Sequence, residues 1–256
     1  MDDHTVAGRM LDIIEAVATS VGAMSLARLT AETGLPKATV RRIANNLVGH
    51  RMLQLGPDGY RLGLRVLELG KSAERHIAVA ETAGPFLQEL SQSTGQITWA
   101  GVVADDSFLI ADTAFTPRHR TLMASATTRD WMPRVRRGEC PRTAVGQLLI
   151  ALEPDRIEDV LRAGIPRATP YTVTSPQLVL ERLRHATDSG LATEYEESRL
   201  GWWCAATVVP GPSATHIIGI TAETKSLPPA RGLRQLNTTA DQLGKAMKEG
   251  EGSRPR

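Results

Sequence analysis

Five basic residues are concentrated in one short stretch of the chain. Residues 34–62 hold five cations against one acid, a local charge of +4, whereas residues 1–33 hold two cations against five acids, a charge of −3. Clusters of Lys and Arg neutralise the phosphates of DNA. The asymmetry therefore predicts a module that presents one face to double-stranded DNA, and its basic residues are Lys37, Arg41, Arg42, Arg51 and Arg61.

Residues 36–50 carry the side chains best suited to reading bases. Arg41 is the first candidate for a two-point contact to guanine, because a guanidinium fork matches the guanine O6 and N7 acceptors. Lys37 and Thr39 lie near the start of this segment, where a recognition helix meets base edges. Ser25 is a candidate phosphate contact or, alternatively, only a helix cap. The other candidate DNA contacts are Arg42, Asn45 and Arg61.

A second candidate site lies where Arg142 precedes Thr143. Thr143 is suited to cap a helix running to Leu152, which leaves free backbone N–H groups in its first turn. The positive end of a helix dipole holds carboxylates readily, and Arg142 could add a charge-assisted bond. This pattern predicts a site for a small organic acid.

Enzymatic chemistry in the second half of the chain is the competing hypothesis. Cys204 could act as a nucleophile, or Glu196 and Glu197 as acid–base groups, with the N-terminal module serving only to dock the enzyme. No histidine stands near these residues at metal-ligand spacing, and the six histidines are scattered in a way typical of loops and surfaces. We therefore expect no enzyme activity, no catalytic residue, no metal and no cofactor.

Three helices and a hairpin are predicted to position the basic residues. Ser25 and Gly34 are suited to begin and end the second helix, and Pro36 suits the first turn of the third. A Gly-Pro-Asp-Gly turn joins the two β-type runs that follow. This order predicts a winged helix-turn-helix over residues 1–62. The helices are expected over 6–19, 26–33 and 36–50, and the β-type runs over 52–55 and 60–62.

The rest of the chain is predicted to form a linker helix and a second domain. The linker helix is assigned to 63–80, with a break at Gly84-Pro85, the second domain to 81–248, and a disordered tail to 249–256. Strands followed by helices and then strands indicate an α+β fold. Strands are expected over 97–103, 108–114, 121–126, 191–196, 204–209 and 217–222, and helices over 143–152, 154–163, 176–189 and 230–248.

The composition narrows the class of protein. A net charge of +2 over 256 residues is too small for non-specific binding of polyanions by the whole chain. Two cysteines, Cys140 and Cys204, are too few for a disulfide framework, and we expect reduced thiols. The acidic start is unlike a secretory signal, and no stretch of about 18 apolar residues could span a membrane. A cytoplasmic protein is the expectation.

Several segments resemble the IclR family of transcriptional regulators. In the first sixty or so residues they are Arg9–Glu15, Ser25–Leu29, Thr33–Arg42 and Tyr60–Gly63, followed by Leu67–Gly70. In the second domain they are Arg142–Ala151 and Gly190–Glu197 leading into Gly201–Ala206. The resemblance covers residues 6 to about 248. The glutamate pair followed by Gly and then Cys-Ala-Ala is its most specific part.

The resemblance implies a GAF-like effector-binding domain, a homodimer or a dimer of dimers, and control of metabolic operons as a repressor or an activator. By analogy with family members that bind small organic acids, the resemblance also implies which residues of this chain line the effector pocket. Trp202 and Trp203 would supply an aromatic wall, which suggests an apolar or aromatic acid, although core or interface packing explains them equally well. The pocket residues implied are Ala144, Val145, Glu194, Trp202, Cys204 and Thr221, beside Arg142 and Thr143.

Three positions depart from the family pattern. Ala38 stands where serine is usual, so one phosphate-binding hydroxyl is missing. Gln147 follows Gly146 where lysine is common, and Trp202-Trp203 is bulky for its loop. These departures affect the expected effector rather than the class of protein.

Overall fold

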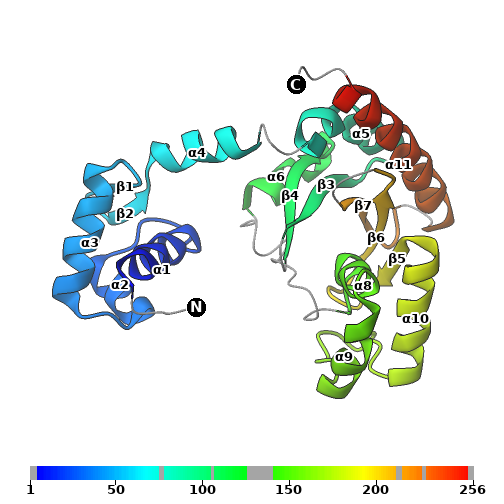
Figure 1. Cartoon of the computed structure of the whole chain (residues 1–256), viewed down its shortest axis with the longest axis horizontal. Helices are drawn as coiled ribbons and strands as arrows, with labels where there is room; N and C mark the ends of the chain where they lie inside the picture. Colours follow the sequence, from blue (N-terminus) through cyan, green and yellow to red (C-terminus); the bar gives the residue numbers. More distant parts are fainter. Residues whose placement is uncertain are drawn as a thin grey trace. The chain divides into compact units, whose positions relative to one another are not determined.

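The computed structural model describes residues 5–74, 78–104, 107–125, 141–211, 215–226 and 229–252. The chain divides into two compact units, residues 1–76 and 77–256 (Figure 1). The first contains three helices and a hairpin, and the second contains a five-stranded sheet with helices on both faces.

The three helices of the first unit enclose a small apolar core. They are α1 (Val6–Ala18), α2 (Leu26–Thr33) and α3 (Lys37–Gly49). Each helix contributes apolar side chains at helical spacing to one cluster, and Ile13, Leu29 and Val40 are fully buried in it. Burial of such side chains stabilises the unit by roughly 1.5–3 kcal/mol each. The opposite face of α3 is left exposed to solvent.

The ends of α2 follow from its capping residues. The Ser25 hydroxyl accepts a hydrogen bond from the Arg28 amide at 3.2 Å, which satisfies one of the free donors of the first turn. Gly34 ends the helix with φ +65, a left-handed conformation that glycine adopts without strain. Both predicted caps are confirmed, and Pro36 lies one residue before α3 rather than in its first turn.

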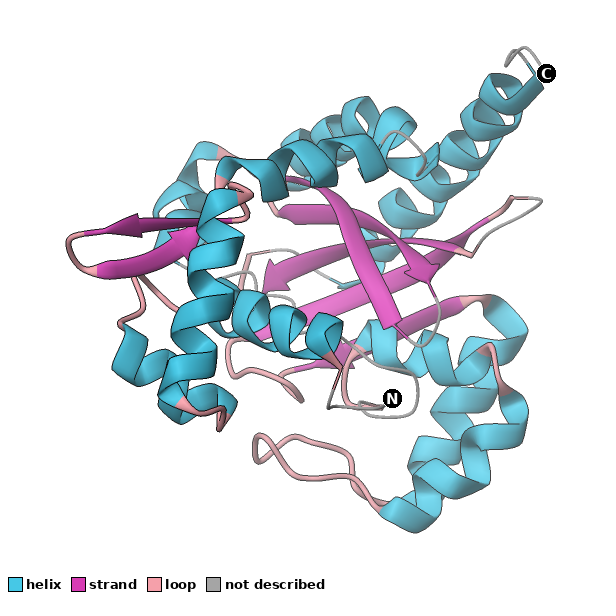
Figure 2. Cartoon of the chain, turned by 60° about the vertical axis from the view of Figure 1, so that its left-hand side comes forward, coloured by secondary structure: helices cyan, strands magenta, loops and turns pink. Residues whose placement is uncertain are grey.

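The hairpin consists of β1 (Leu53–Gly56) and β2 (Gly59–Leu62), an antiparallel pair that is separate from the large sheet (Figure 2). Tyr60 exchanges backbone hydrogen bonds of 2.8 Å with Met24, so β2 is also tied to the segment before α2. Gly59 makes this close approach possible: a Cβ there would lie 2.4 Å from the Met24 carbonyl oxygen, and its φ is +128. Together the helices and the hairpin form the predicted winged helix-turn-helix.

Two further helices follow the hairpin, α4 (Leu64–Glu74) and α5 (Ala78–Thr94). The expected break at Gly84-Pro85 is wrong, because α5 continues through Pro85. A proline inside a helix costs about 3 kcal/mol. Burial of Val79, Ala83, Leu87 and Leu90 against the second core offsets that cost. Residues 75–77, between the two helices, lie outside the described residues.

The second unit is built on an antiparallel sheet of order β4-β3-β7-β6-β5. The helices α5 and α11 (Pro229–Gly252) cover one face, where Trp203, Ala205 and Ile220 form the core. Helix α8 (Ala144–Ala151) packs on the other face with Trp99, Ala206 and Ile217. The strands are β3 (Ile97–Ala104), β4 (Ser107–Ala114), β5 (Leu191–Tyr195), β6 (Trp202–Val209) and β7 (His216–Glu223).

Two further helices pack beside α8 and form a third apolar cluster of the second unit. Helix α9 (Ile157–Ala163) follows a short 3₁₀ turn, η2 (Pro154–Arg156), and α10 (Pro176–Ser189) runs beside both α8 and α9. Val160, Val179 and Leu183 are buried between them. The α+β architecture expected from the order of strands and helices is confirmed.

Two predicted elements are wrong in this unit. Residues 121–126 were expected to form a strand, but α6 (Arg120–Ser125) is a helix that follows the 3₁₀ turn η1 (Pro117–His119). Leu122, Met123 and Ala124 favour helices intrinsically, which explains the outcome. The tail was expected to be disordered from Glu249, but α11 continues to Gly252. Residues 253–256 lie outside the described residues.

Candidate DNA interface and effector site

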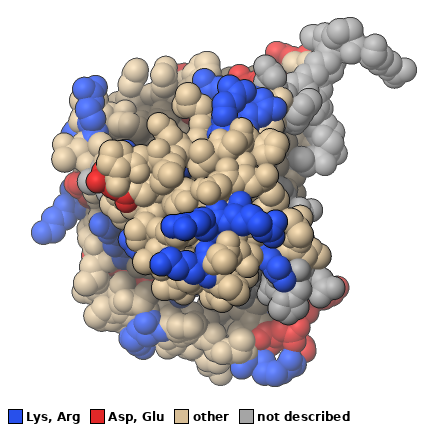
Figure 3. Space-filling model, turned by 90° about the vertical axis from the view of Figure 1, so that its left-hand side faces the viewer, with Lys and Arg blue, Asp and Glu red and all other residues tan. Residues whose placement is uncertain are grey.

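The exposed face of α3 carries the predicted DNA contacts. Val40, Ile43 and Leu47 face the core, so the intervening positions turn outward with a helical period of 3.6 residues. Lys37, Arg41 and Arg42 are exposed, and none forms a salt bridge with any described acid. Thr39 is half-buried beside them. Figure 3 looks onto the first unit and shows many more Lys and Arg than acidic side chains.

The hairpin carries another of the predicted DNA contacts, Arg61. Arg61 on β2 is exposed, and its guanidinium lies 3.8 Å from the Asp58 carboxylate, an exposed pair that contributes little to stability. The Tyr60 hydroxyl donates to Asn45 Oδ1 at 3.4 Å and so joins β2 to α3. Asn45 keeps its amide NH₂ for a donor contact. Ser25 caps α2 and remains exposed.

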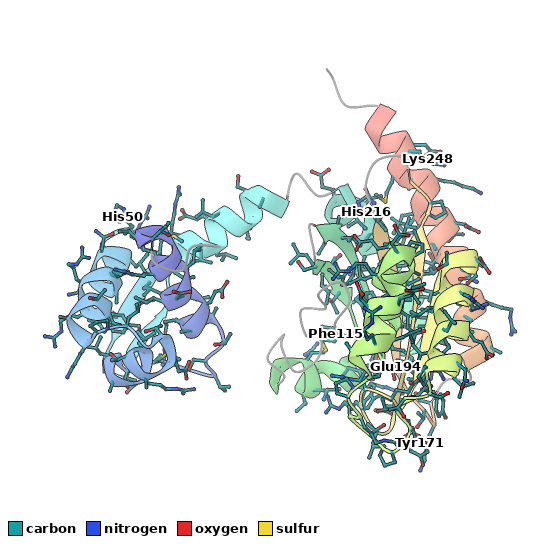
Figure 4. The ribbon with its side chains drawn as sticks, turned by 60° about the horizontal axis from the view of Figure 1, so that its bottom comes forward. His50, Phe115, Tyr171, Glu194, His216 and Lys248 are labelled. Carbon is teal, nitrogen blue, oxygen red and sulfur yellow. The ribbon has the colours of Figure 1, made fainter. Side chains whose placement is uncertain are left out.

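Three of the predicted effector-site residues form one row across the sheet. Glu194 on β5 pairs with Cys204 on β6, and Cys204 pairs with Thr221 on β7. The Cys204 sulfur lies 3.6 Å from the Thr221 hydroxyl. Because side chains alternate along a strand, this row faces α8, where Ala206 and Ile217 also pack. Figure 4 labels Glu194 on this unit.

The N-terminus of α8 lies above this sheet face. The Thr143 hydroxyl accepts from the Gly146 amide at 3.0 Å, so the predicted cap is confirmed. Ala144 and Val145, in the first turn, are buried in the cluster that includes Trp99. Arg142 precedes them in a turn and is half-buried. The helix dipole and this guanidinium both favour an anion.

Glu194 is a buried carboxylate held by the turn that follows β5. It accepts hydrogen bonds from the amides of Glu197 and Ser198, at 3.0 and 3.3 Å, and from the Ser198 hydroxyl at 2.7 Å. Burial raises the pKa of the Glu194 carboxyl to about 7, even though these hydrogen bonds act in the opposite direction. Near neutral pH this side chain can therefore accept or donate a hydrogen bond.

The groups proposed for enzymatic chemistry have other roles. Burial and, after it, the nearby Glu194 carboxyl raise the pKa of the Cys204 thiol to about 12, whereas a nucleophilic cysteine needs a lowered pKa. The Glu196 carboxylate accepts from the Gly201 amide at 2.6 Å, and Glu197 pairs with Arg182. None of these arrangements activates a nucleophile. Cys140 lies outside the described residues.

The two adjacent tryptophans lie on opposite faces of the sheet. Trp202 is half-buried on the face of Cys204, so it remains a candidate wall of the site. Trp203 is fully buried in the core against α5 and α11. The expectation that both could form the aromatic wall is wrong for Trp203, because the period-two alternation of β6 sends it to the other face.

Sequence reasoning missed three residues beside this site. Trp99 on β3 donates from Nε1 to the Thr221 hydroxyl at 3.1 Å, and it lies over Gly219, where a Cβ would be 2.1 Å from its ring. The His119 ring lies 6.4 Å from the Trp202 ring. Ser198 holds Glu194. Strand pairing places Trp99 beside Thr221, 122 positions away, which no local sequence pattern encodes, whereas Ser198 lies only four residues from Glu194.

The expectation that the histidines lie in loops and on the surface is wrong for two of them, since His119 and His216 are buried. Removal of the ring from water, followed by the nearby Arg118 charge, lowers the pKa of His119. Among the described residues, no group of three or more His, Cys, Asp or Glu side chains could hold a metal ion. No helix in the described ranges is long and apolar enough to cross a membrane.

A winged helix-turn-helix with an exposed cationic recognition helix, on the same chain as an α+β domain with a buried polar site, defines a DNA-binding transcriptional regulator. The chain matches the family model of the bacterial transcriptional regulator IclR C-terminal domain over residues 72–243 and that of the IclR helix-turn-helix domain over residues 6–57. The chain belongs to the IclR family.

Known relatives are similar over most of their length. The HTH-type transcriptional regulator XynR of Escherichia coli is 26% identical over 84% of this chain and 83% of its own. The DNA-binding transcriptional repressor YiaJ of the same organism is 27% identical over 92% and 85%. An IclR homolog from Microbacterium hydrocarbonoxydans, crystallised with 4-hydroxybenzoate, is 19% identical, covers 96% of this chain and all of its own, and has a TM-score of 0.80.

Proposed function

We propose that this protein binds a pseudo-palindromic operator and that a small organic or aromatic acid changes its affinity for that operator. The observation that carries the proposal is the exposed face of α3, with its three cations free of described acid partners. Unpaired cations on a recognition helix are available for phosphates and base edges. The proposed DNA contacts are Ser25, Lys37, Thr39, Arg41, Arg42, Asn45 and Arg61.

The proposed effector site lies between the N-terminus of α8 and the row formed by Glu194, Cys204 and Thr221. An acid would place its carboxylate at the capped helix end, near Arg142. Its other end would meet the sheet face, where Trp202 offers an aromatic surface. The 4-hydroxybenzoate bound by a protein of the same fold supports an acid of this kind. Thr143, Ala144 and Val145 complete the proposed site.

We propose a homodimer, or a dimer of such dimers, as the DNA-binding form. Twofold symmetry in the protein matches twofold symmetry in an operator. Exposed apolar side chains on α4, Leu64 at 74% and Leu67 at 55%, together with Leu11 on α1 at 56%, suit burial against a second copy. The proposed division of the chain is 1–62 for the DNA-binding domain, 63–80 for the linker helix and 81–248 for the effector domain. We also propose a cytoplasmic location, where a protein that acts on an operator meets its DNA.

The test is a thermal-shift screen of small carboxylic acids on the full chain, with aromatic and aliphatic acids represented, followed by operator binding with and without each hit. A ligand that binds the folded state raises its stability by mass action. We expect at least one acid to raise the melting temperature and to change operator affinity. An acid that binds without changing operator affinity, or operator binding that no acid affects, would contradict the proposal.

A further inference from the structure

The turn between β5 and β6, residues 196–201, is held by an ion pair whose carboxylate, that of Glu197, is buried and whose guanidinium, that of Arg182, is partly exposed. We propose that Arg182 and Glu197 are positioning residues for the proposed effector site: their ion pair fixes the 196–201 turn, and the turn holds the Glu194 carboxylate in place. The inference rests on the proposed function, because it takes Glu194 to be part of the effector site.

The Glu197 carboxylate is the centre of the arrangement. Its side chain is only 3% exposed, and it accepts hydrogen bonds from the Arg182 guanidinium and, at 3.1 Å, from the Val173 amide. Arg182 reaches it from α10 and is 40% exposed. A carboxylate removed from water needs such partners, since an unpaired buried charge is strongly destabilising. The pair therefore fixes where residue 197 can lie.

A neighbouring loop fixes the backbone of the same turn. The Thr169 hydroxyl donates to the Glu196 carbonyl at 2.6 Å, and the Thr172 hydroxyl donates to the Glu197 carbonyl at 2.8 Å. Tyr171, which Figure 4 labels, marks this loop. The loop leads into α10 and so connects the turn a second time to the helix that carries Arg182.

The other side of the turn faces Glu194. The amides of Glu197 and Ser198 donate to Glu194 Oε2, and the Ser198 hydroxyl donates to Oε1. Glu197 thus contacts Arg182 through its side chain and Glu194 through its backbone. Displacement of the Glu197 backbone would remove its amide donor from Glu194.

The turn also has a strained backbone. Glu196 has φ +56, which is unfavourable for a residue other than glycine, and its carboxylate closes the turn on the Gly201 amide. Such conformations persist where surrounding contacts over-determine them, and they are concentrated at functional sites. The ion pair and the two threonines supply those contacts. They maintain a turn whose role is to present donors to Glu194.

The test is hydrogen exchange of the full chain without effector or DNA, read as protection factors at the Glu197 and Ser198 amides between pH 5.5 and 8.5. Glu194 accepts these bonds best when ionised, so protection in the wild type should step upward near pH 7. The charged neighbour that acts on Glu194 is Glu197, whose carboxylate raises the pKa of Glu194. Cys204, whose pKa is about 12, stays neutral over this pH range. The variants are Arg182→Met, Arg182→Lys and, as the control on the exposed side of α10, Arg184→Met.

We expect Arg182→Met to lose about tenfold or more protection at both amides at pH 8 and to lose the step near pH 7, because the turn opens locally. Arg182→Lys keeps a cation and should stay within about threefold, and Arg184→Met should match the wild type. Unchanged protection and an unchanged step in Arg182→Met would overturn the proposal. An equal loss at the β7 amides of Ile218 and Ile220 would also overturn it, since the pair would then only stabilise the whole unit.

If Arg182→Met does not fold, the test is instead a comparison of the pH-dependent step in Glu197→Gln with that in Arg182→Lys. Loss of the step in Glu197→Gln with retention in Arg182→Lys supports the positioning role, and retention in both contradicts it. Because neither effector nor DNA is present, failure of this proposal leaves the proposed function intact. Failure of the acid screen, conversely, leaves the exchange result unaffected.

Discussion

The Tyr60 hydroxyl donates a hydrogen bond to Asn45 Oδ1 at 3.4 Å, so the hairpin and the recognition helix are joined by side chains as well as by the shared core. Tyr60 also exchanges two backbone hydrogen bonds with Met24, just before α2. Tyr60 on β2 therefore contacts α3 directly and also contacts the segment that precedes α2. These contacts fix the hairpin relative to α3 and to the segment before α2.

Gly59→Ala should destabilise the first unit, because the new Cβ would lie 2.4 Å from the Met24 carbonyl oxygen at a backbone φ of +128. Strain of this kind costs on the order of 1–3 kcal/mol. The control is Gly56→Ala at the other end of the same turn, where the nearest atom is 3.9 Å away. Urea unfolding followed by circular dichroism measures both. Equal stability of the two variants would contradict the close approach of β2 to Met24.

Lys37→Ala should reduce the salt dependence of operator binding. Each phosphate contact by a cation contributes about −0.9 to the slope of log Kobs against log salt concentration, so the slope should become shallower by about 1. Lys245→Ala, an exposed cation on α11, is the control and should leave the slope unchanged. Fluorescence anisotropy over a salt series gives both slopes. An unchanged slope for Lys37→Ala would remove this residue from the interface.

Glu194 should make the stability of the second unit depend on pH. Burial raises the pKa of its carboxyl to about 7 from an ordinary value of 4.5, so between these values the folded state binds more protons than the unfolded state. Stability therefore falls as pH rises from about 4.5 to 7 and then levels off. The full effect is at most about 3 kcal/mol, at 1.36 kcal/mol per pKa unit.

Unfolding measured from pH 5 to 8 in the wild type and in Glu194→Gln isolates this contribution, since the other titrating groups are shared. The difference in unfolding free energy between the two proteins should change across this range and be constant above it. Ser198→Ala removes a hydrogen bond that lowers the pKa of Glu194, so it should move the change to higher pH. Parallel curves for the wild type and Glu194→Gln would mean that Glu194 does not titrate here.

The first unit could be predicted almost completely from sequence because its signals are local. Ser25 and Gly34 mark the ends of α2 by their own chemistry, and Gly-Pro-Asp-Gly marks the hairpin. The cations of α3 stand out because residues 34–62 contain one acid. The structure then added what is not local, such as the contact of Tyr60 with Asn45.

The second unit was harder to predict because its site depends on strand pairing. Glu194, Cys204 and Thr221 form a row only because three strands pair in a particular register. The family resemblance implied these residues as a set but not their arrangement. Trp99 joins that row through a bond to Thr221, a residue 122 positions away in the chain. The break predicted at Pro85 was wrong for a related reason. Proline disfavours a helix locally, but burial of α5 in a core made by distant strands outweighed that effect.

Specific DNA recognition by Arg41 tests the account most directly. The DNA site is the sequence that the wild-type chain selects from a random pool, and anisotropy then compares wild type, Arg41→Ala and Arg162→Ala, an exposed arginine on α9. We predict that Arg41→Ala weakens binding by about 1–3 kcal/mol, roughly five- to 150-fold, and relaxes the preference at one position of each half-site. Arg162→Ala should match the wild type. Unchanged affinity and unchanged base preference in Arg41→Ala would contradict the assignment of α3 as the recognition helix.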